Sequence, residues 1–226
     1  MTSIMLFAAG LGTRMGALTA DKPKPMVEVA GRPLIDHTLD LTKGQPLNTP
    51  VVNLHYKADI LRDHLADRSV VFSDETDLLR DTGGGLRHAL PLMGPDPVVT
   101  LNTDAIWNGP NPIAQLLNAW RDDMEGLLML IPTAQVLGHK GKGDFVIDNT
   151  GRLTRQPGHI YSGLQMIRTD GLAEISDDVF SLNRLWDNAI ARGTLHGITY
   201  AGRWCDVGQP DSIPIAETLI GENADV

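Results

Sequence analysis

A glycine-containing segment near the start of the chain restricts the fold more than any other feature. An apolar run at residues 4–8 leads directly into Ala9-Gly10-Leu11-Gly12-Thr13-Arg14. Gly10 and Gly12 are free to adopt positive φ and leave room beside the backbone, so successive N–H groups can face an anion. Arg14 adds a planar, permanently charged group suited to phosphate oxygens. The segment predicts a buried strand followed by a phosphate-binding loop; an ordinary strand-to-helix turn is the alternative for the glycines alone.

A dinucleotide-binding loop is the nearest competitor, and the following residues disfavour it. The Gly-x-Gly-x-x-Gly pattern requires a third small residue where this chain has Met15, and an acidic residue about 20 positions further on. Glu28 is misplaced for that role. The chain instead continues through Pro23-Lys24-Pro25, whose prolines leave the lysine little backbone freedom. We therefore expect Lys24 to serve the phosphate-binding loop rather than to lie in solvent.

Short apolar runs alternate with amphipathic segments through the first 131 residues. Strands are expected at residues 4–8, 50–54, 70–73, 98–101 and 127–131, with helices between them at 33–43, 57–66, 84–92 and 112–121. Pro33 and Pro112 suit a first helical turn, where a missing N–H costs nothing. Continuous apolar strands separated by helices imply a mostly parallel sheet covered on both faces.

The pattern changes after about residue 140. Residues 145–147 and 152–154, joined by Asp148-Asn149-Thr150-Gly151, predict a β-hairpin. A strand at 160–167, a helix at 182–191, a strand at 195–201 and a helix at 212–220 are expected to follow. Because no repeat, low-complexity segment or Ser-rich linker divides the chain, we expect one α/β domain with an antiparallel extension in its second half.

Composition excludes several classes of function. The 28 acidic and 19 basic residues give a net charge of −9, which argues against non-specific binding to nucleic acid or to an anionic membrane. A phosphate ligand must then be held by local groups or by a metal. The single cysteine, Cys205, excludes an internal disulfide and a four-cysteine zinc site. The apolar run at 4–9 is too short to span a bilayer and lacks the flanks of a signal peptide, so a cytoplasmic protein is expected.

Three segments together resemble the signature of the sugar-1-phosphate nucleotidylyltransferases. They are Ala8-Ala9-Gly10-Leu11-Gly12-Thr13-Arg14, Pro23-Lys24-Pro25-Met26 and Val29-Ala30-Gly31-Arg32-Pro33-Leu34-Ile35. The resemblance continues at lower density over almost the whole chain. It implies a Rossmann-like three-layer α/β sandwich with a mixed, mostly parallel central sheet and a small antiparallel sugar-binding extension. It also implies a single domain over residues 1–226, with a nucleotide-binding half at about 1–110 and a sugar-binding half at about 111–226.

The same resemblance implies roles for individual residues. Catalytic roles fall on Arg14, Lys24 and Asp104. Contacts with the nucleotide are implied for the residues of the loop and for a few beyond it: Ala9, Gly10, Leu11, Gly12, Thr13, Arg14, Lys24, Gly83, Gly84 and Asn102. The last of these adjoins an apolar strand that ends in Asn102-Thr103-Asp104.

Two aspartates are candidate metal ligands. Asp104 directly follows a buried strand, where α/β sheets bind ligands, although a turn or helix cap would also account for it. The family usually carries Gly-Asp here, whereas this chain has Thr103 before the aspartate, which could narrow the space near a metal. Asp206 lies in Trp204-Cys205-Asp206-Val207-Gly208-Gln209-Pro210, similar to the family's Trp-x-Asp-x-Gly-x-Pro. Two carboxylates with open water positions suit Mg²⁺.

The remaining candidates concern the base and the sugar. The triple glycine of Asp81-Thr82-Gly83-Gly84-Gly85 suits close approach to a flat nucleobase, with a flexible helix start as the alternative. It looks most like the muramate-type uridylyltransferases. Substrate-binding roles are implied for Asn53, Asp144, Ser162 and Gly163, and a strand-edge turn is the alternative for Asp144. Many thymidylyl- and guanylyltransferase relatives carry Glu-Lys-Pro where this chain has Arg155-Gln156-Pro157, which weakens the case for a plain hexose substrate.

The implied reaction couples N-acetylmuramate-1-phosphate to UTP, giving a UDP-sugar and pyrophosphate, with Mg²⁺ as cofactor. Glucose- or mannose-1-phosphate, and phosphocholine with CTP, stay open as alternative substrates. A non-catalytic nucleotide-sensing subunit is a further alternative, disfavoured because Arg14, Lys24, Asp104 and Asp206 are all present. No nucleic-acid or membrane partner is expected, and we expect a monomer or weak dimer.

Overall fold

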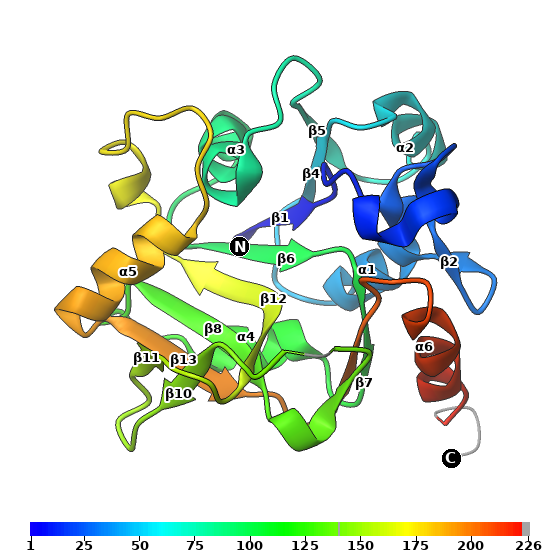
Figure 1. The fold of residues 1–226 in the computed structure, drawn as a ribbon. Helices are drawn as coiled ribbons and strands as arrows, with labels where there is room; N and C mark the ends of the chain where they lie inside the picture. Colours follow the sequence, from blue (N-terminus) through cyan, green and yellow to red (C-terminus); the bar gives the residue numbers. More distant parts are fainter. Residues whose placement is uncertain (140, 223–226) are drawn as a thin grey trace.

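The structure, a computed structural model, describes residues 1–139 and 141–222. Its centre is a seven-stranded sheet in the order β13-β8-β12-β6-β1-β4-β5 (Figure 1). The strands are β1 (Ser3–Phe7), β4 (Val51–Leu54), β5 (Val71–Asp74), β6 (Val98–Asn102), β8 (Gly126–Ile131), β12 (Ile160–Ile167) and β13 (Leu195–Thr199). Only β12 in this sheet runs antiparallel to its neighbours β6 and β8. The mixed, mostly parallel sheet that the sequence predicted is therefore confirmed.

Helices cover both faces of this sheet because its strands are apolar on both sides. Ile4 and Leu6 of β1 pack with α1 (Leu34–Thr42), α2 (Ala58–His64) and α4 (Pro112–Ala119). Met5, between them, packs with α3 (Asp81–Ala89) and α5 (Asn183–Arg192), since successive strand residues point to opposite faces. A third cluster packs beneath α6 (Ser212–Gly221). The result is the predicted three-layer sandwich.

Smaller sheets extend the central one. A three-stranded sheet contains β7 (Ala105–Asn108), β14 (Arg203–Asp206) and β9 (Val136–Leu137). The predicted hairpin is formed by β10 (Phe145–Ile147) and β11 (Leu153–Arg155), and β2 (Glu28–Val29) pairs with β3 (Arg32–Pro33). Short 3-10 turns complete the fold: η1 (Thr13–Thr19), η2 (Lys24–Met26), η3 (Leu90–Leu92), η4 (Thr133–Gln135) and η5 (Asp170–Leu172).

The differences from the sequence prediction are concentrated at edges and short strands. Helix α3 begins at Asp81, three residues before the predicted start, and so includes the triple glycine. The strands β7, β9 and β14 were not predicted: they are short, and β14 pairs with strands far away in the sequence, so no hairpin turn marks them as it marks the equally short β10 and β11. They matter here because β7 begins directly after Asp104 and β14 ends at Asp206, so their pairing brings the two candidate metal ligands together.

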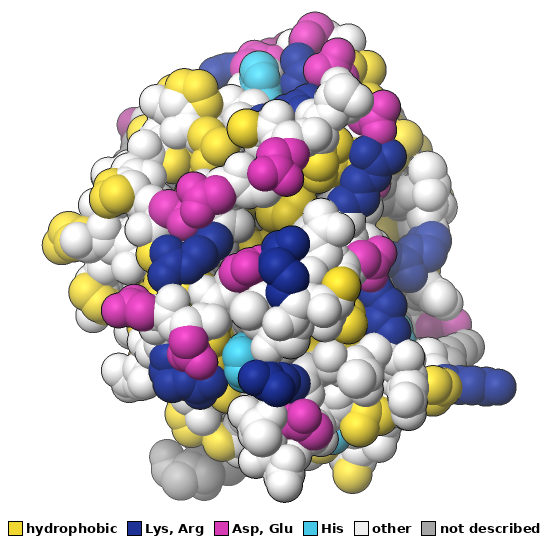
Figure 2. All heavy atoms as spheres, turned by 90° about the vertical axis from the view of Figure 1, so that its left-hand side faces the viewer, with side chains coloured by type: hydrophobic (Ala, Val, Ile, Leu, Met, Phe, Trp, Pro, Cys, Tyr) yellow, Lys and Arg dark blue, Asp and Glu magenta, His cyan; other side chains and the backbone are white. Residues whose placement is uncertain are grey.

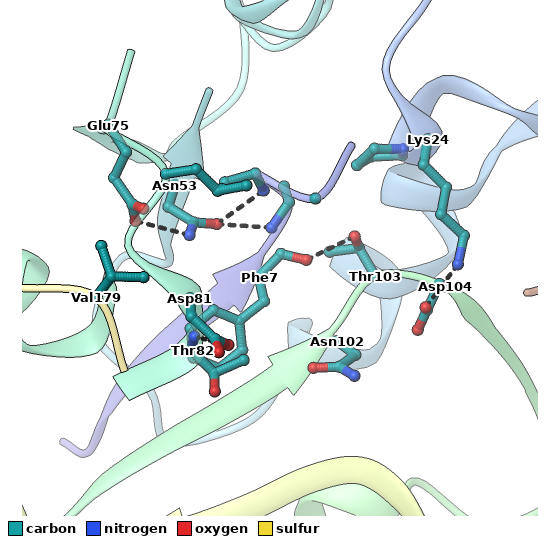
Figure 3. Close-up of a pocket in the computed structure, with 15 residues that line it drawn as sticks. Phe7, Lys24, Asn53, Glu75, Asp81, Thr82, Asn102, Thr103, Asp104 and Val179 are labelled. Atoms are coloured by element: carbon teal, nitrogen blue, oxygen red, sulfur yellow. Dashed lines mark hydrogen bonds and ion pairs between the residues drawn. The ribbon is translucent and has the colours of Figure 1, made fainter. Parts of the chain in front are cut away.

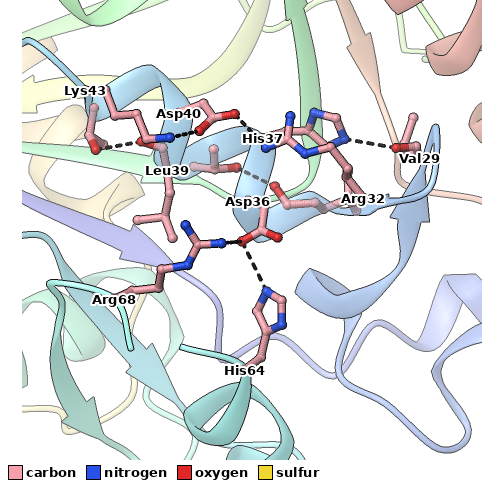
Figure 4. Close-up of polar contacts among 12 residues, drawn as sticks. Val29, Arg32, Asp36, His37, Leu39, Asp40, Lys43, His64 and Arg68 are labelled. Carbon is pink, nitrogen blue, oxygen red and sulfur yellow. Dashed lines mark hydrogen bonds and ion pairs between the residues drawn. The ribbon is translucent and has the colours of Figure 1, made fainter. Parts of the chain in front are cut away.

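Polar contacts fasten α1 to the segments around it (Figure 4). Asp36 accepts a hydrogen bond from Nε2 of His64 at 3.1 Å and lies 3.7 Å from Arg68. Asp40 is ion-paired with Arg32 and Lys43. Burial alone would raise the pKa of Asp40, but the hydrogen bonds from Lys43 and Arg32 outweigh it and hold that pKa below its ordinary value.

The surface carries charges of both signs. On the face shown in Figure 2, Lys and Arg side chains are interspersed with Asp and Glu side chains rather than segregated from them. No helix within residues 1–139 and 141–222 is long and apolar enough to cross a membrane.

Candidate active site

A cavity of about 440 Å³ lies where the parallel strands β1, β4 and β6 end (Figure 3). Its walls come from segments far apart in the sequence: Phe7–Gly10, Lys24, Pro25, Asn53, Glu75, Leu79, Asp81, Thr82, Asn102–Asp104 and Val179. The carboxyl edge of a parallel sheet is the usual place for a ligand in an α/β fold. The predicted loop, lysine and first aspartate therefore share one cavity.

The start of the glycine loop is held by a buried amide. Oδ1 of Asn53 accepts hydrogen bonds from the N–H of Ala8 at 2.7 Å and of Ala9 at 3.2 Å. Nδ2 of Asn53 donates to Oε1 of Glu75, which is fully buried, at 2.8 Å. Asn53, predicted to bind the sugar, thus lines the cavity of the glycine loop and orders that loop.

The two glycines of the loop differ in conformation. Gly12 has φ +64°, and a Cβ there would lie 2.9 Å from Cβ of Lys24, so only glycine lets the loop pass this close to the lysine. Gly10 does not adopt positive φ; it lines the cavity with open space beside it. Leu11 and Thr13 are exposed and are not among the residues lining the cavity.

Lys24 and Asp104 meet inside the cavity. Nζ of Lys24 donates to Oδ2 of Asp104 at 2.7 Å, and the two side chains are 12% and 29% exposed. Pro23 and Pro25 are buried on either side of the lysine, so its backbone is fixed as expected from the proline-flanked sequence. The ammonium and carboxylate remain accessible to a ligand.

Strand pairing brings the second aspartate beside the first. Asp206 of β14 pairs with Ala105 of β7, and the N–H of Val207 donates to the carbonyl of Asp104 at 2.8 Å. Arg14 is exposed, and its Nη1 lies 3.3 Å from where a Cβ on Gly208 would be; that same position is 3.0 Å from Oδ1 of Asp206. Arg14 and Asp206 therefore lie together against Gly208, next to the cavity but not among its lining residues.

A glycine on the neighbouring strand β12 leaves the space that the Asn102 side chain occupies. Gly163 has φ +85°, and a Cβ there would lie 2.7 Å from Cβ of Asn102. Ser162 is buried and donates to the carbonyl of Met129 at 2.7 Å. These two predicted substrate-binding residues thus shape β12 around Asn102. Thr103 donates to the carbonyl of Phe7 at 2.8 Å, which ties the end of β6 to the end of β1.

A second cavity of about 310 Å³ adjoins the first. Both are lined by Phe7, Asp81, Thr82 and Asn102. The second is completed by Asp144 and Tyr161 and by residues at the start of α5. Oδ2 of Asp144 accepts from the N–H of Tyr161 at 2.8 Å, and burial raises the pKa of the Tyr161 phenol. Of the predicted substrate-binding residues, Asp144 lines this second cavity, whereas Asn53 lines the first.

The triple glycine packs against Phe180, whereas the sequence predicted that it would lie against a nucleobase. The N–H groups of Gly83 and Gly84 both donate to the carbonyl of Phe180, at 2.9 and 3.0 Å. A Cβ on Gly83 would lie 2.4 Å from the Phe180 ring. The predicted close backbone approach exists, but the structure fills it with the segment around Phe180. The cavity is lined by Asp81 and Thr82 rather than by these two glycines.

Several site residues were missed by sequence reasoning. Nδ1 of His139 lies 3.1 Å from Oδ2 of Asp206; a single histidine in a glycine-containing loop has no local pattern that distinguishes a site residue. Glu75 was missed because a single acid after a strand has no local pattern. Trp186 is only 7% exposed and packs in the core, yet it also lines the second cavity.

The donor set fits a hard divalent cation. Asp104 and Asp206 offer carboxylate oxygens, the ligands that Mg²⁺ prefers. Within the described residues neither Oδ1 of Asp104 nor Oδ1 of Asp206 accepts a hydrogen bond, since Lys24 and His139 hold the Oδ2 atoms. No group of three or more His, Cys, Asp or Glu side chains in the described part of the chain could enclose a metal. The pair suits an ion that keeps waters and binds substrate oxygens.

Comparison with known proteins places the chain in a family. Residues 4–140 match the model of the MobA-like NTP transferase domain, which is more than half of the chain. The chain belongs to this family of nucleotidyltransferases. The transferase is 38% identical to N-acetylmuramate alpha-1-phosphate uridylyltransferase of Caulobacter vibrioides, over 96% of each chain. It is 28% identical to the enzyme of the same description from Neisseria meningitidis serogroup B, over 96% of this chain and 97% of that one.

A solved structure supports the fold of this nucleotidyltransferase. HddC from Yersinia pseudotuberculosis superposes with a TM-score of 0.79 over 97% of this chain and all of that one, at 20% identity. At that identity the similarity concerns the fold alone. The resemblance drawn from the sequence signature is thus confirmed at the level of family and fold.

Proposed function

We propose that this enzyme transfers a uridylyl group from UTP to N-acetylmuramate-1-phosphate, releasing pyrophosphate. The observation that carries the proposal is the meeting of Lys24 and Asp104 at 2.7 Å in a cavity bounded by the glycine loop. The relative from Caulobacter, similar over nearly its full length, supports the choice of base and sugar. Glucose-1-phosphate, mannose-1-phosphate and phosphocholine are the substrates to be tested against it.

The chemistry needs positioning more than a base. A phosphate oxygen of the sugar-1-phosphate attacks the α-phosphorus of UTP; an O–P bond forms, the bond to the bridging α–β oxygen breaks, and pyrophosphate leaves with its electron pair. The nucleophile is already ionised at neutral pH, so catalysis consists of alignment and charge stabilisation. The ammonium of Lys24 has three N–H groups, and Asp104 accepts from one of them. The others would donate to phosphate oxygens. Arg14 and the N–H groups of the loop would hold the departing pyrophosphate.

A divalent cation, Mg²⁺ in our proposal, would be held by Asp104 and Asp206. When bound, it supplies positive charge to phosphate oxygens. The chain's own contribution is to keep the two carboxylates adjacent through the pairing of β7 with β14. His139 fixes the orientation of Asp206 from the other side.

The two adjoining cavities suggest a division of labour within one domain. We assign the first, lined mainly by residues before 105, to the nucleotide and the second, lined mainly by residues after 143, to the sugar. This corresponds to the proposed halves at about 1–110 and 111–226. We expect the enzyme to act in the cytoplasm, where nucleoside triphosphates are available.

A substrate matrix tests the proposal. Four nucleoside triphosphates are combined with N-acetylmuramate-, N-acetylglucosamine-, glucose- and mannose-1-phosphate and with phosphocholine, and pyrophosphate release is measured. The expected result is the highest kcat/KM for UTP with N-acetylmuramate-1-phosphate. A higher value for another pair would replace the assignment, and binding of a nucleotide without turnover of any pair would favour a sensing subunit.

A further inference from the structure

The wall of the second cavity is a rigid aromatic platform. Nε1 of Trp186 donates to Oε1 of Gln165 at 2.7 Å, and Nε2 of Gln165 donates to Oγ1 of Thr100 at 3.1 Å. The indole also meets the rings of Tyr161 and Phe145 edge-on, with centroids 4.8 and 5.9 Å away. A hydrogen-bonded, tightly packed indole has one orientation, so anything that rests on it is also held in place.

Arg155 rests on this platform. Its guanidinium lies 5.3 Å from the centre of the Phe145 ring and 5.7 Å from that of Trp186. Nε donates to Oδ1 of Asp187 at 2.7 Å, and Nη2 donates to Oδ1 of Asn183 at 2.8 Å. Within the described residues Nη1 makes no hydrogen bond, and the side chain is 39% exposed. The guanidinium is therefore oriented on one side and open on the other.

Charge makes this residue unusual in its surroundings. Among the described residues that line the second cavity, Arg155 is the only one with a positive charge, whereas Asp81 and Asp144 are negative. A neutral sugar needs no such cation, because hydroxyl groups are satisfied by carboxylate and amide groups. An oriented guanidinium is the group that best matches a carboxylate.

We propose that Arg155 binds a carboxylate on the sugar and so sets the specificity of this enzyme. The inference rests on the proposed function. N-acetylmuramate carries a lactyl ether that ends in a carboxylate, and N-acetylglucosamine lacks that group but is otherwise the same sugar. Arg155 thus selects the acidic sugar by pairing with the lactyl carboxylate through Nη1, while Asp187 and Asn183 hold the guanidinium in position.

A comparison of two substrates in three variants tests this role. The substrates are N-acetylmuramate-1-phosphate and N-acetylglucosamine-1-phosphate with UTP; the variants are Arg155→Gln, Asp187→Asn and the control Arg184→Gln. Arg184 lies on α5, as Asp187 does. Like Arg155 it is ion-paired with an aspartate, Asp177, and packs against an aromatic ring, that of Phe180, but it lines neither cavity. Thermal unfolding of each variant establishes that it is folded.

Arg155→Gln is expected to lower kcat/KM for the muramate substrate by about 10- to 100-fold, the usual effect of losing a hydrogen-bonded charge. The loss should appear in KM rather than kcat, because the carboxylate is remote from the reacting phosphates. The value for the glucosamine substrate should change less than about twofold. Asp187→Asn keeps an oxygen that can accept the hydrogen bond from Nε of Arg155, so this variant and Arg184→Gln should retain the preference for the acidic sugar. Binding of the UDP-sugar products to Arg155→Gln, measured by calorimetry, should show the same selective loss.

Three outcomes would overturn the inference. Equal losses of kcat/KM with both substrates would mean that Arg155 has only a structural role, in attaching the β10–β11 hairpin to α5. The same selective loss of kcat/KM in Asp187→Asn would mean that the ion pair between Arg155 and Asp187, and not a contact with the sugar, causes the effect. An unchanged preference for the acidic sugar in Arg155→Gln would show that Arg155 does not set specificity. If the wild-type enzyme fails to use the muramate substrate, both this inference and the proposed function fail; if it uses that substrate and only the variant result is negative, the inference alone fails.

Discussion

Lys24 and Asp104 hold each other in the cavity where the proposed reaction would take place. Each is accessible to a ligand yet held by its partner, with Nζ and Oδ2 2.7 Å apart. The flanking prolines are buried and restrict the lysine backbone. A phosphate oxygen that enters the cavity therefore meets an ammonium already in place, so little reorganisation is needed when charge develops.

At this scale we predict that Lys24→Ala and Asp104→Asn each lower kcat/KM by roughly 10²–10³, as the loss of one pre-positioned charged group does elsewhere. Steady-state pyrophosphate release measures the effect, and circular dichroism verifies the fold. Lys22→Ala is the matched control, because Lys22 lies two residues away but does not line the cavity. Near-normal activity in either site variant would contradict the assigned roles.

Among the elements, α3 and the segment around Phe180 are fitted to each other through glycines. The carbonyl of Phe180 accepts from Gly83 and Gly84, and its N–H donates to the carbonyl of Arg80 at 3.2 Å. Thr82 also accepts from the N–H of Leu182, just before α5. The helix that borders the first cavity is thereby attached to the helix that borders the second.

Gly83→Ala is expected to destabilise the protein by about 1–3 kcal/mol, because the added Cβ collides with the Phe180 ring and overpacking costs that much. The sign of the change in unfolding free energy distinguishes the two cases, because a glycine-to-alanine substitution without a clash stabilises a protein by about 0.4–1 kcal/mol. Gly171→Ala serves as the control, since its nearest neighbour would be 4.0 Å away. Urea unfolding measures both; a Gly83→Ala protein as stable as the wild type would contradict the close fit.

On the scale of the whole molecule, the residues of the candidate site meet at the edge of the sheet where β1, β4 and β6 end. The central sheet brings Phe7, Asn53 and Asn102 to one edge, and the pairing of β7 with β14 adds Asp206. Around this frame, surface carboxylates such as Asp40 and Asp74 are held by cations or hydroxyl groups. Hydrogen bonds from Thr76 lower the pKa of Asp74, as those from Lys43 and Arg32 lower that of Asp40.

Stability should consequently fall in acid. Because both carboxylates have folded-state pKa values below the ordinary 3.8, their contribution is complete above the unfolded pKa and is lost as pH falls through the folded one. Asp40→Asn should lower Tm by no more than about 4 °C at pH 7, given that exposed ion pairs contribute up to about 1 kcal/mol. The difference from wild type should shrink below pH 4.

Calorimetry from pH 2 to pH 7 measures this convergence. Asp67→Asn, at an exposed carboxylate without a hydrogen bond within the described residues, should follow the wild-type curve throughout. A difference between Asp40→Asn and wild type that stays constant down to pH 2 would show that the carboxylate charge is not what stabilises α1.

Much of the molecule was predictable because its signals are local. The glycine loop, the proline-flanked lysine and the apolar strands each occupy fewer than about ten residues, and their backbone geometry follows from steric and hydrophobic rules that act over that range. β12 was predicted at residues 160–167, where the structure has Ile160–Ile167. The short strands β7 and β14 were missed because each pairs with a strand about 100 residues away, so no local turn between them marks the pair.

Local sequence was enough to predict the strand–loop unit, the proline-flanked Lys24 ten residues beyond it and the placement of Asp104 after an apolar strand. Other contacts arise only when the folded elements pack together: Asp206 lies beside Asp104, His139 contacts Asp206, Phe180 covers the triple glycine, and Arg155 rests on Trp186. The physical reason is that these contacts join residues far apart along the chain. Their proximity depends on which strand edges and helix faces pack together, and no local pattern of residues specifies that choice.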